Sequence, residues 1–213
     1  MTPLAADLLR LEHRQRANAD DRDSTPVIIS RNREKLINAI VYFASNTRHC
    51  GKIKLIKLLY LLDFTHFRAT GVSVTGLEYH AWKLGPVPID VYQEWDAPGD
   101  DLAAAIEIVP EKAIDYVRES VMPRREFDAT HFTRRELALV QELAARFCDE
   151  LTRPLINFTH AELGPWHKIW DSGRGRNERI PYALAVGDTD PNREAVLEIA
   201  REHEGIAAAA RLN

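Results

Sequence analysis

The sequence predicts a mainly α fold: a compact helical bundle around a central apolar helix at about residues 51–68, with a small β element. Apolar residues cover nearly the whole circumference of that central segment, which is typical of a helix in the middle of a bundle. Three further segments repeat apolar residues at intervals of three and four, the spacing of an amphipathic helix. Two stretches that mix β-branched and aromatic residues favour short strands.

The first thirty residues are predicted to form an appendage. Three leucines give their opening helix only a thin apolar stripe, which is typical of a peripheral helix. Residues 20–26 are charged and end in a proline, as linkers do. We therefore expect an N-terminal helical arm and linker over residues 1–30 and the main domain over residues 31–213.

Local signals set the elements of the main domain. Thr133 and Glu136 form a capping box, a strong sign of a helix start, and Thr159 and Glu162 repeat its spacing. The glycine and two prolines of residues 85–88 are expected to end any regular element. We expect helices over residues 32–45, 51–68, 88–95, 101–107, 134–151 and 190–203, and strand-like segments over residues 75–84 and 116–127.

The composition excludes several classes of protein. The chain has 213 residues and a formal net charge of −4, whereas a dedicated nucleic-acid-binding domain is usually strongly basic. Its two cysteines are too few for a disulfide framework or a cysteine-type zinc site. The longest apolar run is about half a membrane span and carries two charges, and charged residues interrupt the N-terminal stretch where a signal peptide would be apolar. We expect a cytoplasmic protein without membrane contact, and nucleic acid is not an expected partner.

The titratable residues give no coherent catalytic pattern. Asp63 and His66 lie three apart on the central helix and share a face, so the pair could do acid–base chemistry. The favoured alternative is the polar end of a core helix, whose side chains hydrogen-bond to a neighbouring loop. His160 and His167 lie seven apart with a Gly-Pro pair between them, and no two histidines have the spacing of a metal motif. We expect no cofactor and no metal.

The tryptophans are more informative. Trp82, Trp166 and Trp170 lie beside Gly-Pro turns or their flanking segments. Tryptophan is enriched at binding hot spots, because it buries a large area with few rotamers. A tryptophan packed over a Gly-Pro turn can equally seal the edge of a core. Both interpretations stay open.

Three motifs, in order, carry a resemblance to a known family. They are KLLYLLDFTHF from Lys57, AWKLGPVP from Ala81 and THAELGPW from Thr159. Together they closely resemble the SocA-like antitoxin domain, also called Panacea, across about residues 33–170. Leu84 stands where an aromatic residue is common in that family, and Leu163 is an extra residue before the last Gly-Pro pair.

The resemblance implies a bacterial or prophage antitoxin, without enzymatic activity, that neutralises a cognate toxin by direct binding. One branch of the family resembles a proteolytic adaptor that delivers its toxin to the ClpXP protease, so a ClpXP-type protease is a possible second partner. The charged and aromatic motif residues are the expected toxin-binding set: Asp63, His66, Trp82, Lys83, Gly85, Pro86 and Trp166.

Two other classes of function stay open. The first is a small metal-dependent or His/Asp-dependent enzyme that uses Asp63, His66, His80 and His160. The second is a DNA-binding regulator of its own operon, for which the acidic net charge predicts weak non-specific affinity.

Overall fold

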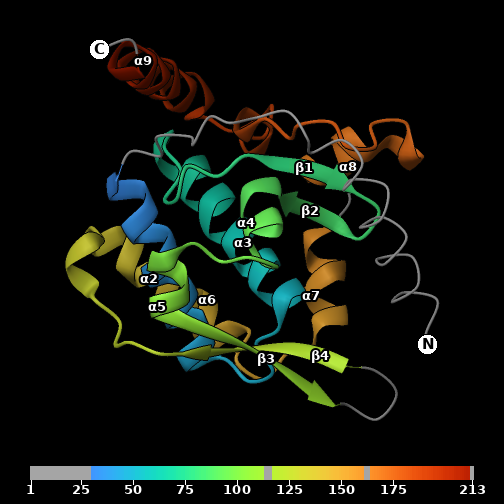
Figure 1. Ribbon diagram of the computed structural model, residues 1–213. Coiled ribbons are helices and arrows are strands. Elements are labelled where there is room, and N and C mark those ends of the chain that lie inside the picture. The colour runs from blue at the N-terminus through green and yellow to red at the C-terminus, as the bar shows by residue number, and fades with distance from the viewer. Residues whose placement is uncertain (1–29, 113–116, 161–163, 212–213) are drawn as a thin grey trace.

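The structure is a computed structural model that describes residues 30–112, 117–160 and 164–211. It confirms a mainly α fold with a small β element (Figure 1). The predicted N-terminal arm and linker lie outside the described residues. None of the helices in the described part of the chain combines the length and apolar character that crossing a membrane requires.

Helices and short strands alternate along the chain. The helices are α2 (Ser30–Asn46), α3 (Lys52–Thr70), α4 (Ile89–Glu94), α5 (Asp100–Ala105), α6 (Arg134–Arg146), α7 (Thr152–Thr159), α8 (Pro165–Trp170) and α9 (Arg193–Arg211). The strands are β1 (Tyr79–Trp82), β2 (Gly85–Pro88), β3 (Ile106–Lys112) and β4 (Val117–Pro123), and the single 3-10 turns are η1 (Ala129–His131), η2 (Asp171–Gly173) and η3 (Tyr182–Ala185).

Helix α3 is the centre of the fold, as its all-round apolar pattern predicts. It packs against α2, α6, α7, β2 and the start of α9, and 14 of its 19 residues are buried (Figure 1). Gly71 ends the helix with a left-handed φ of 78°, and its N–H donates to the Phe67 carbonyl. A Cβ at this glycine would lie 2.5 Å from the Val196 carbonyl, so only glycine lets α9 pack so closely.

Strand β2 was not predicted, because residues 85–88 were expected to end all regular structure. Pro86 and Pro88 pair with Ala81 and Tyr79 of β1 in an antiparallel hairpin. The backbone of those two β1 residues bonds instead to residues 177–180: the Ala81 N–H donates to Glu178, and its carbonyl accepts from Asn177. The prolines therefore occupy positions of β2 at which no N–H is needed, which removes the usual objection to proline in a strand.

The second hairpin also differs from the prediction. The helix expected over residues 101–107 ends at Ala105, and Ile106 begins strand β3, whose pairing with β4 runs from Ile106–Pro123 to Lys112–Val117. The sequence predicted only the β4 side of this sheet. Ile106 is buried and Glu107 is exposed, so the two-residue period begins only after the short helix.

Helix α6 begins as predicted and ends early. Thr133 and Glu136 form the capping box, and Lys35 of α2 pairs with the same glutamate at 2.6 Å. The predicted helix ran to Leu151, but α6 stops at Arg146. The buried Lys54 ammonium donates to the Cys148 and Glu150 carbonyls, which stabilises a turn where a longer helix would bond those groups internally.

Two further boundaries depart from the prediction. The Thr159 hydroxyl donates back to the Ile156 carbonyl at the end of α7, a helix that the sequence did not predict. The second half of the capping box proposed there, Glu162, lies outside the described residues. The last helix begins at Arg193 and continues to Arg211, beyond the predicted residues 190–203.

Candidate functional site

Segments from the three sequence motifs meet around the turn between β1 and β2. Helix α3 brings Lys57 and Tyr60, the hairpin brings residues 82–88, and the end of α7 and the start of α8 bring His160 and Trp166. The Lys57 ammonium donates to the Pro86 carbonyl at 2.8 Å. The Tyr60 hydroxyl accepts a hydrogen bond from the Trp166 backbone, at the N-terminus of α8. Residues about 100 positions apart in the sequence are thus held together by the central helix.

Gly85 lies where these segments converge. Its φ is 106°, a backbone conformation that favours glycine. A Cβ at this position would lie 2.6 Å from Lys57 Nζ and 2.7 Å from His160 Nε2. The absence of a side chain therefore makes room for both nitrogen atoms beside the turn.

The two nitrogen atoms have unusual electrostatics. Lys57 is 1% exposed, and burial lowers the pKa of its amine to about 7. The His160 ring stacks on Trp166 with 3.8 Å between the ring centroids. Burial, followed by the nearby Lys57 charge, lowers the pKa of His160 to about 4, against a hydrogen bond with the Leu84 backbone. His160 Nε2 is buried and has no hydrogen-bond partner among the described residues.

Trp82 and Trp166 hold the hairpin to the rest of the domain. Trp166 Nε1 donates to the Trp82 carbonyl at 3.0 Å. The Trp82 ring meets Tyr92 of α4 edge-on, with 4.8 Å between the centroids. Its own Nε1 is buried without a hydrogen-bond partner in the described part of the chain. Both tryptophans are at least 95% buried, so in this structure they close the edge of the core.

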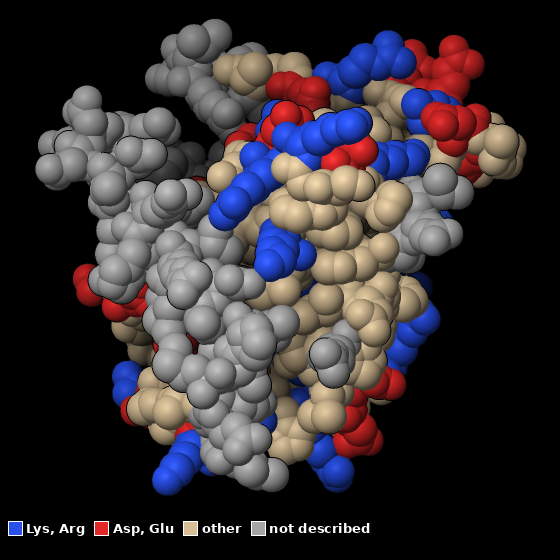
Figure 2. Space-filling view, turned by 90° about the vertical axis from the view of Figure 1, so that its right-hand side faces the viewer, with Lys and Arg blue, Asp and Glu red and all other residues tan. Residues whose placement is uncertain are grey.

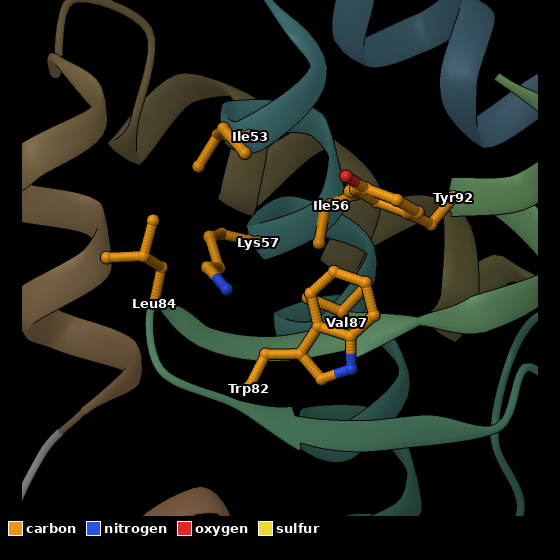
Figure 3. Close-up of a pocket in the computed structure, with 7 residues that line it drawn as sticks. All are labelled: Ile53, Ile56, Lys57, Trp82, Leu84, Val87 and Tyr92. Atoms are coloured by element: carbon orange, nitrogen blue, oxygen red, sulfur yellow. The ribbon is translucent and has the colours of Figure 1, made fainter. Parts of the chain in front are cut away.

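A small, largely apolar hollow opens beside Lys57, between α3, the β1–β2 hairpin and α4. In Figure 3 the lysine side chain runs between Leu84 and Trp82, with its nitrogen toward the hairpin. The hollow has a volume of about 20 Å³, which is room for roughly one water molecule. Its lining residues are Ile53, Ile56, Lys57, Trp82, Leu84, Val87 and Tyr92.

Asp63 lies about two turns further along α3 than Lys57 and hydrogen-bonds to the loop that precedes β1. One carboxylate oxygen accepts from the Val74 and Thr75 N–H groups at 2.9 and 2.7 Å. The other accepts from the hydroxyls of Thr75 and Tyr79 at 2.5 and 2.8 Å. Burial nevertheless raises the pKa of this carboxyl group, because the side chain is wholly excluded from solvent. Asp63 fixes the loop that leads into β1.

His66 fixes the start of the same loop. Its Nδ1 lies 2.7 Å from the Val72 carbonyl, and the ring is 7% exposed. The structure thus shows for Asp63 and His66 the alternative in which a core helix hydrogen-bonds to a neighbouring loop.

The seven residues expected to bind a partner therefore fall into two groups. Asp63 and His66 lie on α3 and hydrogen-bond to the loop that leads to β1. The other five lie around the hairpin turn: Trp82, Lys83, Gly85, Pro86 and Trp166. Lys83 is exposed, and the other six are buried. Their role in binding stays a prediction.

The expected set omitted Lys57, Tyr60 and His160, which complete the cluster at the turn. A lysine within the mainly apolar part of the central helix was the signal for the first of them, since an amine on a buried face needs an acceptor.

The four residues considered for an enzyme have separate partners. Asp63 and His66 bond to residues 72–79, His80 Nδ1 lies 2.9 Å from the Asn177 carbonyl, and His160 stacks on Trp166. Within the described ranges, no group of three or more His, Cys, Asp or Glu side chains is placed to hold a metal ion.

Exposed basic residues lie on segments that are tied to β1. They are Lys83, Lys168, Arg174, Arg176 and Arg179. Hydrogen bonds from Trp166 to Trp82 and from Asn177 to Ala81 hold α8 and the loop after it against the hairpin. Figure 2 shows Lys and Arg side chains gathered across the upper part of the face that includes α8, above a largely uncharged area. Some acids lie among them: Arg174 pairs with Asp171 and Arg179 with Glu78.

Comparisons with known proteins bear on this site. Searches of curated proteins and of solved structures return no match. The family model described as "Antitoxin SocA-like, Panacea domain" matches residues 55–167, which is just over half of the chain and includes most of α3, both hairpins and the Gly-Pro-Trp segment. The chain belongs to the SocA-like antitoxin, Panacea domain family.

Proposed function

We propose that this protein neutralises a cognate toxin by direct protein–protein binding in the cytoplasm, as the antitoxin of a bacterial or prophage toxin–antitoxin pair. The observation that carries the proposal is the family match over residues 55–167. We assign the binding to the domain of residues 31–213 and treat residues 1–30 as an arm outside it.

We place the toxin-binding surface around the β1–β2 turn. Lys83 is exposed on this turn, and Lys168 and Arg176 are exposed on the segments that pack beside it. Basic residues outnumber acidic ones there, although the whole chain has a net charge of −4. Such a local field favours a partner surface that is acidic.

Rescue of cells that express the toxin tests this function. The toxin is sought in the reading frame beside this one, and a frame that is toxic alone and harmless with this protein supports the proposal. Lys83→Glu should lose rescue and change the melting temperature little, because the side chain is exposed and the interactions of exposed charges contribute little to stability. Lys112→Glu is the matched control, since Lys112 is exposed at the end of β3 in the other hairpin.

Trp82→Ala should behave differently from Lys83→Glu. Truncating a buried tryptophan costs about 3–5 kcal/mol of folding stability, so this variant should lose melting temperature together with rescue. If Lys83→Glu stays folded and still rescues, the binding surface lies away from this turn.

Delivery of the toxin to a ClpXP-type protease is a further step, supported by the family resemblance alone. The half-life of the toxin in cells that contain this protein, with and without the protease, tests it. Equal half-lives would restrict the function to binding.

A further inference from the structure

We propose that the hollow beside Lys57 is an anchor site that takes one acidic side chain of the protein partner. This inference rests on the proposed function and names the chemistry that the partner presents to the β1–β2 turn. The Lys57 amine is a cation inside the protein, and a carboxylate of the partner would complete its hydrogen bonding.

The Lys57 amine makes fewer hydrogen bonds to the described residues than it has donors for. A protonated amine has three donors, and the acceptor that the structure describes is the Pro86 carbonyl at 2.8 Å. No carboxylate within the described ranges contributes to the electrostatics of this group, and burial alone shifts its pKa. A buried charge without a counter-ion is unfavourable, so an anion brought to this site would gain an interaction that nothing described here already satisfies.

Lys54 shows what a purely structural lysine looks like on the same helix. It lies one turn before Lys57 and is equally buried. Its ammonium donates to three carbonyl oxygens, those of Arg48, Cys148 and Glu150, at 2.7, 3.1 and 2.9 Å. All its donors are used in joining α3 to the turns that follow α2 and α6. The contrast marks Lys57 as the lysine with capacity for a further acceptor.

The surroundings of Lys57 fit the tip of an acidic side chain. Leu84, Val87 and Ile53 line the hollow, so the stem of an incoming side chain would meet apolar walls. The volume of about 20 Å³ has room for one small polar group and not for a whole ligand. His160 Nε2 is buried and has no hydrogen-bond partner among the described residues, and it lies beside the same Cβ position of Gly85 as Lys57 Nζ.

The charge at the surface points to the same partner chemistry. Exposed Lys83, Lys168 and Arg176 lie on the hairpin turn and on the segments that pack against it. Positive charge around the site attracts an acidic surface and disfavours a basic one. A glutamate on the partner combines a short apolar stem with a carboxylate, which matches apolar walls that end at an amine.

The test compares Lys57→Met with Lys54→Met in binding to the purified toxin. Lys57→Met should stay folded, because a flexible apolar side chain replaces a charge that burial disfavours. It should lose about 30-fold or more in affinity, the usual effect of removing one member of a buried charge pair. Lys54→Met should lower the melting temperature, because it removes a donor from three carbonyls, of which that of Cys148 keeps the Arg48 N–H. Any protein that stays folded should bind normally.

A second measurement avoids core substitution altogether. The probe is N-acetyl-glutamate methylamide, with its glutamine counterpart as the uncharged control. We expect the glutamate probe, at tens of millimolar, to shift the indole N–H signal of Trp82 in NMR spectra of the wild-type chain, because Trp82 lines the hollow. The glutamine probe should not shift it, nor should the glutamate probe in Lys57→Met.

The outcomes separate this inference from the proposed function. Wild-type affinity of Lys57→Met for the toxin, or equal responses to the two probes, would overturn the anchor site and leave toxin binding standing. A wild-type chain that binds no toxin would refute the proposed function. Glu162 of this chain is the alternative source of a carboxylate. If Glu162→Gln and Lys57→Met lower the melting temperature by the same amount and the probe has no effect, a carboxylate of this chain already occupies the site and the anchor proposal is overturned.

Discussion

Replacement of Gly85 by alanine tests whether the family motifs really converge at the β1–β2 turn. The added Cβ would lie 2.6 Å from Lys57 Nζ and 2.7 Å from His160 Nε2, closer than such atoms can approach without movement. The Lys57 amine is the end of a flexible side chain and can shift into the hollow beside it, whereas the His160 ring is held by its stacking on Trp166. The φ of 106° is also unfavourable for alanine.

The expected loss follows from these two contributions. A non-glycine residue in a disfavoured backbone region costs about 1–3 kcal/mol, and overpacking adds about 1–3 kcal/mol. We expect Gly85→Ala to lower the free energy of unfolding by about 3 kcal/mol, which for a domain of this size lowers the melting temperature by about 6–12 °C. Thermal unfolding followed by circular dichroism measures it.

The control for Gly85→Ala is Gly187→Ala. A Cβ at Gly187 meets no atom within 4 Å, so this variant should unfold within about 0.5 kcal/mol of the wild type. His160→Ala tests the contact itself: in that background Gly85→Ala should cost about 1 kcal/mol less. A Gly85→Ala variant as stable as the wild type, or strictly additive effects with His160→Ala, would refute the convergence.

Three further predictions concern buried and paired charges. Asp63→Asn should lose about 2–4 kcal/mol in denaturant unfolding, because an amide nitrogen replaces an oxygen that accepts two hydrogen bonds; unchanged stability would contradict the role of Asp63 in the loop. Arg33 lowers the pKa of Asp101 to about 2 through their hydrogen bonds, so this pair should stabilise the fold above about pH 4 and lose its effect as the pH falls towards 2. Arg33→Met should remove that part of the acid transition, and an unchanged acid titration would argue against it. Burial lowers the pKa of Lys57 to about 7, so between pH 7 and about 10 the unfolded chain binds more protons at this group, which makes wild-type stability rise with pH. Lys57→Met should make this rise smaller, with the remainder due to Lys54, whose pKa burial also lowers; equal slopes would show that the Lys57 amine is not buried.

The sequence predicted the elements whose signals are local. The apolar circumference of α3 and the capping box of α6 are set by neighbouring residues, and both predictions are confirmed. The end of α6 depends on Lys54, which is almost a hundred residues away and donates to Cys148 and Glu150. Strand β2 depends on residues 177–180 taking the hydrogen bonds that its prolines cannot make. Neither effect is visible in a local pattern.

The candidate site was predictable as a set of segments and not as a set of roles. The motifs correctly brought Gly85, Pro86 and Trp166 into one group, and the structure places them around one turn. The same motifs did not tell a side chain that faces a partner from one that holds a loop. Asp63 is a charged residue of a motif, yet its side chain is buried and accepts four hydrogen bonds within the protein.

Most of the residues that identify the family are therefore not residues that can select a partner. Lys57, Gly85 and Trp166 are buried and serve to hold α3, the hairpin and α8 together. A buried side chain contacts a partner only through an opening, and the one beside Lys57 admits no more than the tip of a side chain. Partner choice must then depend on exposed neighbours such as Lys83 and Arg176, which can be exchanged without disturbing the core. On this reasoning, substitutions on the exposed part of the turn should change which toxin is bound, and substitutions at Lys57 should weaken binding to every toxin that presents an acidic anchor.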